Sequence, residues 1–489
     1  MVFIKEIDSS HSKINHDKIQ GNCCSSNIPS TSQNSYGEDI YREWPYAYVV
    51  STKFRTEYCT YCFKRSDVLK RCSQCQFVYF CGVSCQKNGW PDHKEECVSL
   101  RKVAPKVPTD MSRLMARIIF KQAQQKGKSP SEEVSNGESS RSFEDLMSHS
   151  AEVAEDVVRS EHLATLCQVL KEYVGPGRLP SGVCLLDIFG KIVVNAFSIL
   201  NTDLNPVGTG LYLRLSELDH SCDPDAVVVF SGPKAILRPL KTPADYSKLS
   251  SMRFSYVEPL DETSERRRQL KEQYYFTCEC ANCLNVERNN FMLSLICDSC
   301  HQSAILDENT DTAICVECKT SSKELADKGK FALQSSKWLI EEIEKNKDKE
   351  TDNIKIYEKC TDALKGSLSC LHDENVWKVK ILDHLMDSCI QLQKWNEAFD
   401  FGSRALNAFR KFYPKNYPNM GRQLMMLGKL ALYLEDLSTA ERLLTEATSI
   451  INFCYDENSE LCNNVSELLY NCREERRVKM HNIFKLENL

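Results

Sequence analysis

The chain has 489 residues, of which 42% are hydrophobic and 27% are charged, and its formal net charge is −6. This length favours roughly two to four domains, and the composition excludes a wholly disordered or fibrous chain. The negative charge argues against a basic field that would attract nucleic acid over the whole surface.

The start of the chain and its apolar content bear on where the protein resides. No stretch approaches the roughly eighteen consecutive apolar residues that a membrane span needs. Residues 1–8 contain acidic side chains before any apolar signal core could form. We therefore expect an intracellular protein without membrane contact. Residues 1–35, rich in serine and asparagine towards their end, are expected to be poorly ordered.

Cysteine, with 25 residues, is the outlier of the composition. In a reducing compartment so many thiols indicate metal ligands rather than disulfides. Within residues 59–97, eight Cys or His side chains form four successive pairs, each spaced to supply half of a zinc tetrahedron. Four pairs make two zinc sites, and metal supplies the folding energy because few apolar residues lie between them. The alternative is a set of unrelated buried cysteines.

The stretch that follows has helical patterns at residues 113–125 and 148–173. In the second range apolar residues recur at three- to four-residue steps, namely Val153, Val157, Leu163, Leu166 and Leu170. The Ser/Glu-rich residues 126–144 between the two ranges predict a solvated, flexible loop.

Two further cysteine groups follow a helix-like run at residues 265–273. The first, Cys278, Cys280 and Cys283, is one ligand short of a zinc tetrahedron. The second consists of two Cys-x2-Cys pairs separated by 14 residues, which is typical of a zinc ribbon. Four free surface cysteines are the alternative. The ribbon ligands would be Cys297, Cys300, Cys315 and Cys318.

The rest of the chain, residues 323–489, is expected to be helical. The pattern of residues 392–398 recurs at 434–440, an offset of 42 residues. Tetratricopeptide helix pairs repeat at about 34 residues, and the loop at 413–418 accounts for the extra length. Such helices form a concave surface that suits a peptide or chaperone ligand, or they only buttress the fold.

The spacing within residues 59–97 resembles that of a MYND zinc finger. The resemblance implies interleaved sites, in which the first and third pairs hold one zinc and the other two pairs hold the second. Because both sites are full, it implies structural rather than catalytic metal. The two ligand sets would be Cys59, Cys62, Cys81 and Cys85, and Cys72, Cys75, His93 and Cys97.

The resemblance also bears on the partner of the finger, since MYND fingers bind short, often proline-rich peptides. Residues 53–102 hold ten Lys or Arg against five Asp or Glu. Seven zinc-bound thiolates offset much of this excess, so the charge is too small to favour DNA. We expect a peptide partner.

Residues 208–230, with Asp-His-Ser-Cys-Asp-Pro-Asp at their centre, resemble the core of a SET domain. A SET domain interrupted by a MYND finger is typical of the SET and MYND domain (SMYD) family of protein-lysine methyltransferases, which this chain resembles over residues 36–480. The resemblance implies a zinc-rich α+β multidomain fold. It comprises a β-rich SET domain split by the finger, a post-SET zinc segment with a zinc-ribbon-like insertion, and a C-terminal α-helical tetratricopeptide-like domain. The boundaries would be 36–58 for the first part of the SET domain, 59–97 for the finger, 98–258 for a helical insert and the SET core, 259–285 for the post-SET segment, 286–322 for the insertion and 323–489 for the helical domain.

The same resemblance implies the residues of an active site. Tyr256 would stand at the point of methyl transfer, and Phe197 and Tyr274 would line a channel for the lysine. An apolar aromatic channel disfavours the charged ammonium and so helps to leave the amine neutral. Cofactor contacts would come from Asn195, Asp219, His220 and Phe276. Cys222 would be structural rather than a nucleophile, completing a third zinc site with Cys278, Cys280 and Cys283.

Three features depart from the family pattern. The glycine motif that brings backbone close to the cofactor is not found in residues 14–25. Asp219 stands where the family has Asn, which loses an amide donor and adds a charge. Residues 243–249 replace a Gly-Glu-Glu-Leu run.

These departures leave two functions open. One is an S-adenosylmethionine-dependent protein-lysine N-methyltransferase that acts on histone or non-histone proteins in transcriptional regulation. The other is a catalytically weak or inactive adaptor that binds partners through the finger and the helical repeats. A DNA-binding repressor rests on the finger alone and is disfavoured. We expect a monomer of the cytoplasm and nucleus that takes S-adenosylmethionine and about three to four zinc ions per chain.

Overall fold

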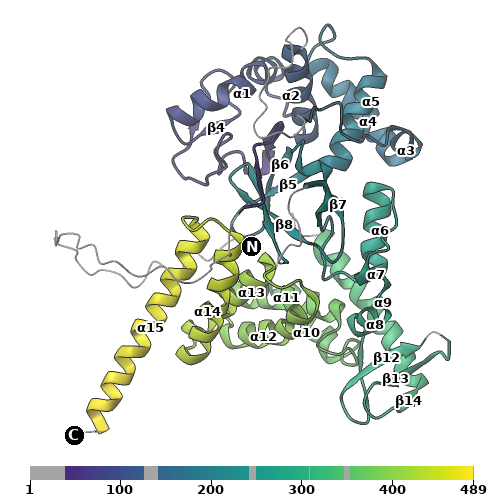
Figure 1. Cartoon of the computed structure of the whole chain (residues 1–489), viewed down its shortest axis with the longest axis vertical. Coiled ribbons are helices and arrows are strands. Elements are labelled where there is room, and N and C mark those ends of the chain that lie inside the picture. The colour runs from purple at the N-terminus through teal and green to yellow at the C-terminus, as the bar shows by residue number, and fades with distance from the viewer. Residues whose placement is uncertain (1–38, 126–140, 242–248, 308, 346–352, 488–489) are drawn as a thin grey trace.

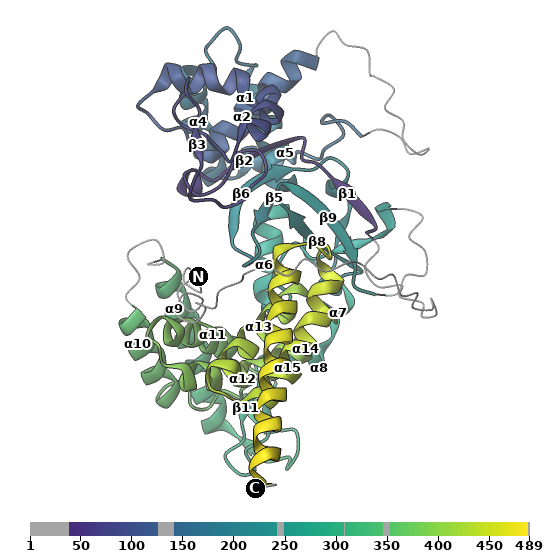
Figure 2. The same cartoon turned by 90° about the vertical axis from the view of Figure 1, so that its left-hand side faces the viewer.

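A computed structural model describes residues 39–125, 141–241, 249–307, 309–345 and 353–487, with side chains up to residue 481. Residues 1–35, most of the expected flexible loop and residues 243–248 lie outside the described ones. Figure 1 shows a mixed part of sheets and helices, coloured purple to teal, above a helical part in green and yellow. Figure 2 shows the same two parts from the side.

Strands that precede the finger pair with strands that follow it. β1 (Tyr41–Glu43) pairs antiparallel with β9 (Lys234–Pro239), which pairs with β8 (Ala226–Ser231). β2 (Ala47–Val50) pairs antiparallel with β6 (Pro206–Leu211), which pairs with β5 (Ala196–Leu200). Apolar and β-branched side chains such as those of the Ala-Val-Val-Val-Phe run in β8 suit these half-buried strands. The residues of the finger are therefore an insertion between strands of shared sheets.

A short parallel pair lies beside these sheets and carries two of the expected site residues. It consists of β7 (Asp219–His220) and β10 (Arg253–Phe254). Short 3-10 helices cover Thr52–Phe54, Leu215–Glu217 and Leu249–Ser251.

The finger contains the hairpin of β3 (Lys70–Arg71) and β4 (Tyr79–Phe80) and most of α1 (Val83–Val103). α2 (Asp110–Gln125) then covers β2. Arg113 Nη1 donates to the Val50 carbonyl at 3.0 Å, and Arg117 Nη1 donates to the Tyr48 carbonyl at 2.6 Å. Two arginines of α2 thus satisfy the outward carbonyls of an edge strand.

The single helix expected over residues 148–173 is two helices. α3 (Ser150–Glu155) and α4 (Val157–Tyr173) are separated at Asp156, whose side chain accepts a hydrogen bond from the Arg159 N–H. An aspartate at this position is a strong N-cap and begins a new helix. Val157 falls in the first turn of α4 and is exposed, although the expected stripe buried it.

The end of the expected flexible loop is anchored. Phe143 is buried, and its ring stacks on that of Tyr46 with centres 5.5 Å apart. α5 (Gly182–Asn195) follows and leads directly into β5.

The segment after the sheets consists of α6 (Thr263–Tyr274), α7 (Ala281–Leu284) and α8 (Val286–Met292). A four-stranded antiparallel sheet follows in the order β11-β12-β13-β14. Its strands are Leu295–Ile296, Ser303–Asp307, Thr312–Cys315 and Ser321–Ser322.

The helical part is built from seven helices within the described residues. Their apolar faces form one continuous core that also includes side chains of β8, β9 and the four-stranded sheet. The last helix extends beyond its neighbours in Figure 1. No described helix has the length and apolar character needed to cross a membrane. The helices are α9 (Lys323–Lys345), α10 (Asn353–Lys365), α11 (Val376–Gln391), α12 (Trp395–Phe412), α13 (Pro418–Tyr433), α14 (Leu437–Cys454) and α15 (Glu460–Glu487).

Candidate active site and zinc centres

The structure brings together four sets of Cys and His side chains. In each set the four ligand atoms lie within 4.8 Å of one another, which fits the tetrahedral N/S coordination of zinc. The two finger sets are interleaved, since Cys62 Sγ is 3.7 Å from Cys81 Sγ and Cys72 Sγ is 3.8 Å from Cys97 Sγ. The sets are Cys59, Cys62, Cys81 and Cys85; Cys72, Cys75, His93 and Cys97; Cys222, Cys278, Cys280 and Cys283; and Cys297, Cys300, Cys315 and Cys318.

A buried carboxylate supports the second set. His93 Nε2 lies 3.6 Å from Cys75 Sγ, and His93 Nδ1 lies 3.6 Å from Glu96 Oε2. A carboxylate behind a ligating imidazole orients the ring and strengthens it as a ligand. Burial alone would raise the pKa of Glu96, but the guanidinium groups of Arg117 and Arg113 outweigh burial and hold this pKa well below its usual range. Two arginines of α2 therefore balance the negative charge of the Glu96 carboxylate.

A buried arginine accompanies the third set. Arg266 is fully buried on α6, with its Nε 3.2 Å from Cys222 Sγ and its Nη2 3.6 Å from Cys283 Sγ. Four thiolates around Zn²⁺ leave a formal charge of about −2, which a neighbouring guanidinium partly offsets. Cys222 comes from the loop after β7, so a zinc ion here would join the post-sheet segment to that loop.

The fourth set lies within the four-stranded sheet and the turns between its strands. Cys300 Sγ lies 3.4 Å from Cys315 Sγ, and Cys297 Sγ lies 3.6 Å from Cys318 Sγ. In Figure 1 this sheet lies at the lower end of the molecule, away from β7. Its position and its full ligand set fit a structural role.

Aromatic rings form a chain of contacts next to the third set. Phe197 of β5 stacks on Phe254 of β10 with ring centres 5.6 Å apart, and the Phe254 centre is 4.9 Å from that of Tyr256. Tyr256 continues the chain to Tyr274, at the end of α6, with centres 4.7 Å apart. These four rings, called the aromatic cluster below, are partly buried. Partial burial fits side chains that line an accessible passage.

The hydroxyl of Tyr256 has a fixed position. It donates a hydrogen bond to the Leu218 carbonyl at 2.5 Å. Burial raises the pKa of Tyr256, and the Asp219 carboxylate and Tyr274 raise it further. The phenol therefore stays protonated at neutral pH, and its oxygen keeps lone pairs that can accept from an amine.

His220 connects the aromatic cluster to the expected cofactor residues. Its Nδ1 accepts from the Tyr256 N–H at 3.0 Å, and its ring centre lies 5.2 Å from Tyr256 and 5.9 Å from Phe276. Burial lowers the pKa of His220 to about 4, so the ring is neutral at pH 7. Asp219 is exposed beside it, and Phe276 is partly buried.

Asn195 lies at the end of α5 and is buried. Its side-chain amide donates to the carbonyls of Met147 at 2.7 Å and Lys191 at 2.8 Å. The N–H groups of this amide are thus hydrogen-bonded to the protein's own backbone. Its carboxamide oxygen is the atom left to meet a ligand.

Three further groups belong to this site but were not singled out from the sequence. Phe254 separates Phe197 from Tyr256, and its place two residues before Tyr256 was the available signal. Arg266 lies in the helical run that the sequence predicted, but nothing there marks it as the buried member. The Leu218 carbonyl is a backbone group and has no sequence signal.

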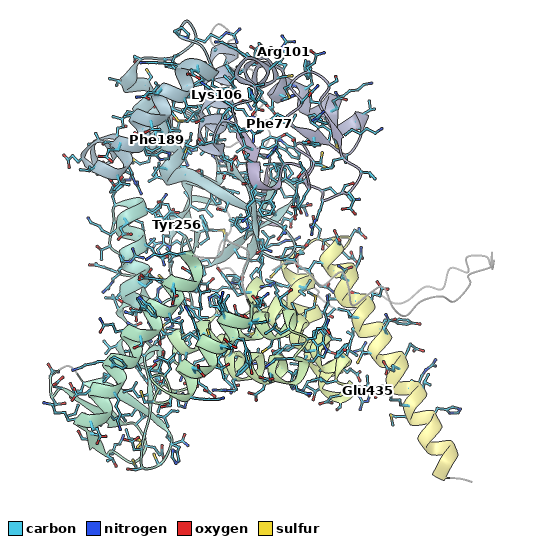
Figure 3. The ribbon with its side chains drawn as sticks, turned by 180° about the vertical axis from the view of Figure 1, so that it is seen from behind. Phe77, Arg101, Lys106, Phe189, Tyr256 and Glu435 are labelled. Atoms are coloured by element: carbon cyan, nitrogen blue, oxygen red, sulfur yellow. The ribbon has the colours of Figure 1, made fainter. Side chains whose placement is uncertain are left out.

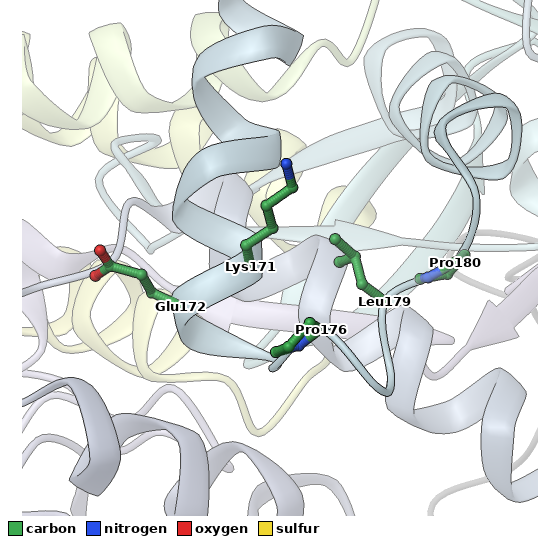
Figure 4. A pocket seen from close by; sticks show the side chains of 5 residues that line it. All are labelled: Lys171, Glu172, Pro176, Leu179 and Pro180. Carbon is green, nitrogen blue, oxygen red and sulfur yellow. The ribbon is translucent and has the colours of Figure 1, made fainter.

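Two surface hollows lie away from this site. The first, shown in Figure 4, is lined by Lys171, Glu172, Pro176, Leu179 and Pro180 at the end of α4. The second lies on the finger; of its lining residues, Figure 3 labels Phe77, Arg101 and Lys106, which lie apart from Tyr256. No residue of the aromatic cluster lines either hollow.

Comparison with known proteins gives concordant matches. The family model of the MYND finger matches residues 59–97. The chain is 31% identical to the histone-lysine N-methyltransferase SMYD3 of Homo sapiens, over 89% of this chain and 92% of that protein. It is 25% identical to the human N-lysine methyltransferase SMYD2, over 84% and 88% of the two chains. It is 28% identical to the histone-lysine N-methyltransferase ASHR1 of Arabidopsis thaliana, over 94% and 98%.

Proposed function

Because this chain belongs to the SET and MYND domain (SMYD) family, we propose that it is a protein-lysine N-methyltransferase that uses S-adenosylmethionine. Its substrate is a lysine side chain of a histone or of another protein. The observation that carries the proposal is the aromatic cluster held between the parallel strand pair and the third Cys set.

The sheets of the mixed part form the catalytic SET core in this proposal. The pairing of β1 with β9 and of β2 with β6 supports a core that is split by the finger. The family boundaries then assign residues 36–58 and 98–258 to the core and 259–285 to the post-SET segment. The helical part is the tetratricopeptide-like domain.

Each residue of the site has a proposed role. Phe197, Phe254 and Tyr274 line the passage for the lysine, and their low polarity disfavours the ammonium form of the substrate. Tyr256 accepts a hydrogen bond from the neutral amine while its own O–H keeps donating to the Leu218 carbonyl. This arrangement orients the amine lone pair, which is where a positioned side chain gains rate.

The chemistry of the side chains around His220 fits S-adenosylmethionine. When bound, this cofactor supplies an electrophilic methyl group on a sulfonium. Phe276 offers an aromatic face for an adenine, and Asn195 and Asp219 offer oxygen acceptors for hydroxyl or ammonium groups. His220 holds the Tyr256 backbone in place through its Nδ1. A zinc ion held by the third set would tie Tyr274 and Phe276 to this region, because both residues lie just before Cys278 in sequence.

Replacing Tyr256 by Phe tests the proposal. We expect methyl transfer from labelled S-adenosylmethionine to core histones and to a protein extract to fall by at least about a hundredfold, as for other lost positioning groups. The fold is expected to stay intact, since one hydrogen bond contributes about 1 kcal/mol. Tyr275→Phe is the matched control, because this neighbouring hydroxyl pairs with Arg159 outside the aromatic cluster. Unchanged transfer by the Tyr256→Phe variant would overturn the assignment.

Calorimetric titration of the zinc-loaded chain with S-adenosylmethionine separates this enzyme from the adaptor alternative. The alternative is favoured by one described feature, the Asp219 carboxylate at the family's Asn position. Micromolar or tighter binding, about −8 kcal/mol, supports the enzyme. Absence of binding supports an adaptor that keeps the finger and the helical domain as binding surfaces.

The finger is a protein-interaction module in this family, and we propose a peptide as its partner here. The concave face of the helical domain is proposed to take a peptide or chaperone ligand. A monomeric state and a location in the cytoplasm and nucleus stay predictions.

A further inference from the structure

The second hollow lies on the finger between the β3–β4 hairpin and the end of α1. Its volume is about 390 Å³. Its wall carries four cationic side chains and two aromatic rings, and no acidic side chain lines it among the described residues. Figure 3 shows Phe77, Arg101 and Lys106 together at this end of the molecule. The six residues are Arg55, Arg71, Arg101, Lys106, Phe77 and Tyr79.

Three of the four cations have no carboxylate partner within the described part of the chain. Arg55 donates to the Thr52 carbonyl at 3.0 Å, and its guanidinium lies 5.3 Å from the centre of the Phe77 ring. Arg101 donates to the neutral Gln74 amide oxygen, at 3.2 Å. Arg71 and Arg101 are exposed. Only Lys106 is paired, with Glu172 at 2.7 Å.

Buried side chains and a residue of the second zinc set frame these cations. Cys75, a ligand of the second zinc set, lines the hollow together with the buried Leu100 of α1. The Phe77 ring contacts the guanidinium groups of both Arg55 and Arg113, the latter 5.0 Å from the ring centre. A positively charged concavity with fixed walls binds anions without having to order its own backbone first.

We propose that this hollow is a docking site for an acidic peptide segment of a partner protein, with side-chain carboxylates or phosphates that pair with Arg55, Arg71 and Arg101. The inference rests on the proposed role of the finger as a peptide-binding module and adds the charge of the peptide. Guanidinium groups suit both anions because they form two parallel hydrogen bonds with each.

A peptide is favoured over nucleic acid by the extent of the positive surface. Nucleic acid binding is typically driven by about six to ten phosphate contacts along a basic stripe. Here three arginines without a carboxylate partner among the described residues gather in one hollow, which offers fewer contacts than that. The aromatic rings and Pro105 in its wall add apolar contact for side chains between the acidic ones.

The test uses the full zinc-loaded chain and fluorescence anisotropy. The probes are a short fluorescein-labelled peptide that alternates phosphoserine with glutamate, its analogue with serine and glutamine, an uncharged proline-rich peptide, and DNA of matched charge. We expect the acidic peptide to bind at least about tenfold more tightly than every other probe. Its affinity should fall as salt rises, because exposed charges are screened.

Variants locate the binding. Arg71→Glu/Arg101→Glu should weaken the acidic peptide by at least about tenfold, and Arg71→Gln/Arg101→Gln should do so to a lesser extent. Lys64→Glu/Lys87→Glu is the matched control, because both lysines are exposed on the finger outside the hollow and the charge change is equal. Metal analysis checks that each variant keeps its zinc.

Three results would overturn the inference. Equal affinity for the acidic peptide in the Arg and Lys variants would remove the hollow as the site. Preference for DNA would assign the hollow to nucleic acid. Preference for the uncharged proline-rich peptide would refute the charge requirement while leaving the finger as a peptide-binding module. None of these three results would bear on the proposed methyltransferase activity, which is measured separately.

Discussion

The charge of Asp219 acts on the Tyr256 hydroxyl, beside which the substrate amine is expected to react. This carboxylate raises the pKa of Tyr256, after the larger effect of burial. A negative charge also favours the ammonium form of a lysine near that hydroxyl, because it stabilises the protonated state. Asp219 therefore keeps more of the substrate in the form that cannot attack.

Replacing Asp219 by Asn is expected to lower the pKa of the bound lysine. The rising limb of the pH profile of kcat should move to lower pH, and kcat at pH 7 should rise. A shift of one pH unit corresponds to about 1.4 kcal/mol and to about tenfold more neutral amine. Rates of methyl transfer between neutral and alkaline pH measure the shift.

Asp223→Asn is the control for this prediction. Asp223 lies in the loop that follows β7, pairs with Lys241 at 2.9 Å, and is not among the charges that raise the pKa of Tyr256. An unshifted profile in the Asp219 variant, or an equal shift in both variants, would contradict the argument.

At the residue scale, the family resemblance nominated Tyr256, His220 and Tyr274, and the structure brings them into contact. The family resemblance could not show that the Phe197 ring is connected to the Tyr256 ring through that of Phe254. That relation depends on how β5 and β10 lie next to each other, and ring stacking between separate elements leaves no spacing pattern in the sequence.

At the element scale, the four cysteines of the third zinc set come from two segments that are far apart in the sequence. Cys222 follows β7, and Cys278, Cys280 and Cys283 follow α6. These cysteines share a buried cluster with Tyr256, Tyr274 and Phe276. Loss of this zinc should therefore disturb the aromatic cluster, whereas loss of the ribbon zinc should not.

Metal analysis of the purified chain is expected to give about four zinc ions, as the four ligand sets require. Cys297→Ser/Cys300→Ser should retain three and keep methyl transfer within about twofold. Cys278→Ser/Cys280→Ser should also retain three but lose methyl transfer, because the metal there supplies local folding energy. Two zinc ions in the unaltered chain would mean that the third and fourth sets are not metal sites.

Sequence patterns predicted elements well where spacing is local. The Cys pairs and the helical run at residues 265–273 are examples. The break at Asp156 carried a recognisable signal, because an aspartate before Val157 and Val158 suits an N-cap. We gave more weight to the apolar periodicity across residues 148–173 and therefore predicted a buried Val157. That prediction is wrong, since Val157 is exposed.

At the scale of the whole molecule, the pairing of β1 with β9 joins residues that are about two hundred positions apart. No local pattern specifies such a pairing, and only the family resemblance anticipated that the finger is inserted in a sheet domain. The contacts between the mixed and helical parts were not anticipated either, because apolar side chains of β8 and β9 and some polar side chains join the helical part only when the two parts meet.

Glu262 is such a side chain. It lies just before α6, is 5% exposed, and accepts hydrogen bonds from Trp377 Nε1 of α11 at 2.8 Å and from Lys337 Nζ of α9 at 2.6 Å. Burial raises the pKa of Glu262, but Lys337, Ser264 and Trp377 outweigh it and lower this pKa below its usual value. The carboxylate is thus ionised at neutral pH and links two helices of the helical part to the post-sheet segment.

Glu262→Ala should destabilise the chain by roughly 1–3 kcal/mol, because it leaves the buried Trp377 N–H without an acceptor. It should also loosen the helical part from α6, which hydrogen exchange would detect as faster exchange in α11. Since the helical part lies beside α6 and not against His220, we expect KM for a protein substrate to rise while affinity for S-adenosylmethionine stays unchanged. Glu341→Ala is the matched control, since this glutamate is exposed on α9. Equal exchange in both variants would show that Glu262 does not hold the two parts together, and the substrate effect would then need another cause.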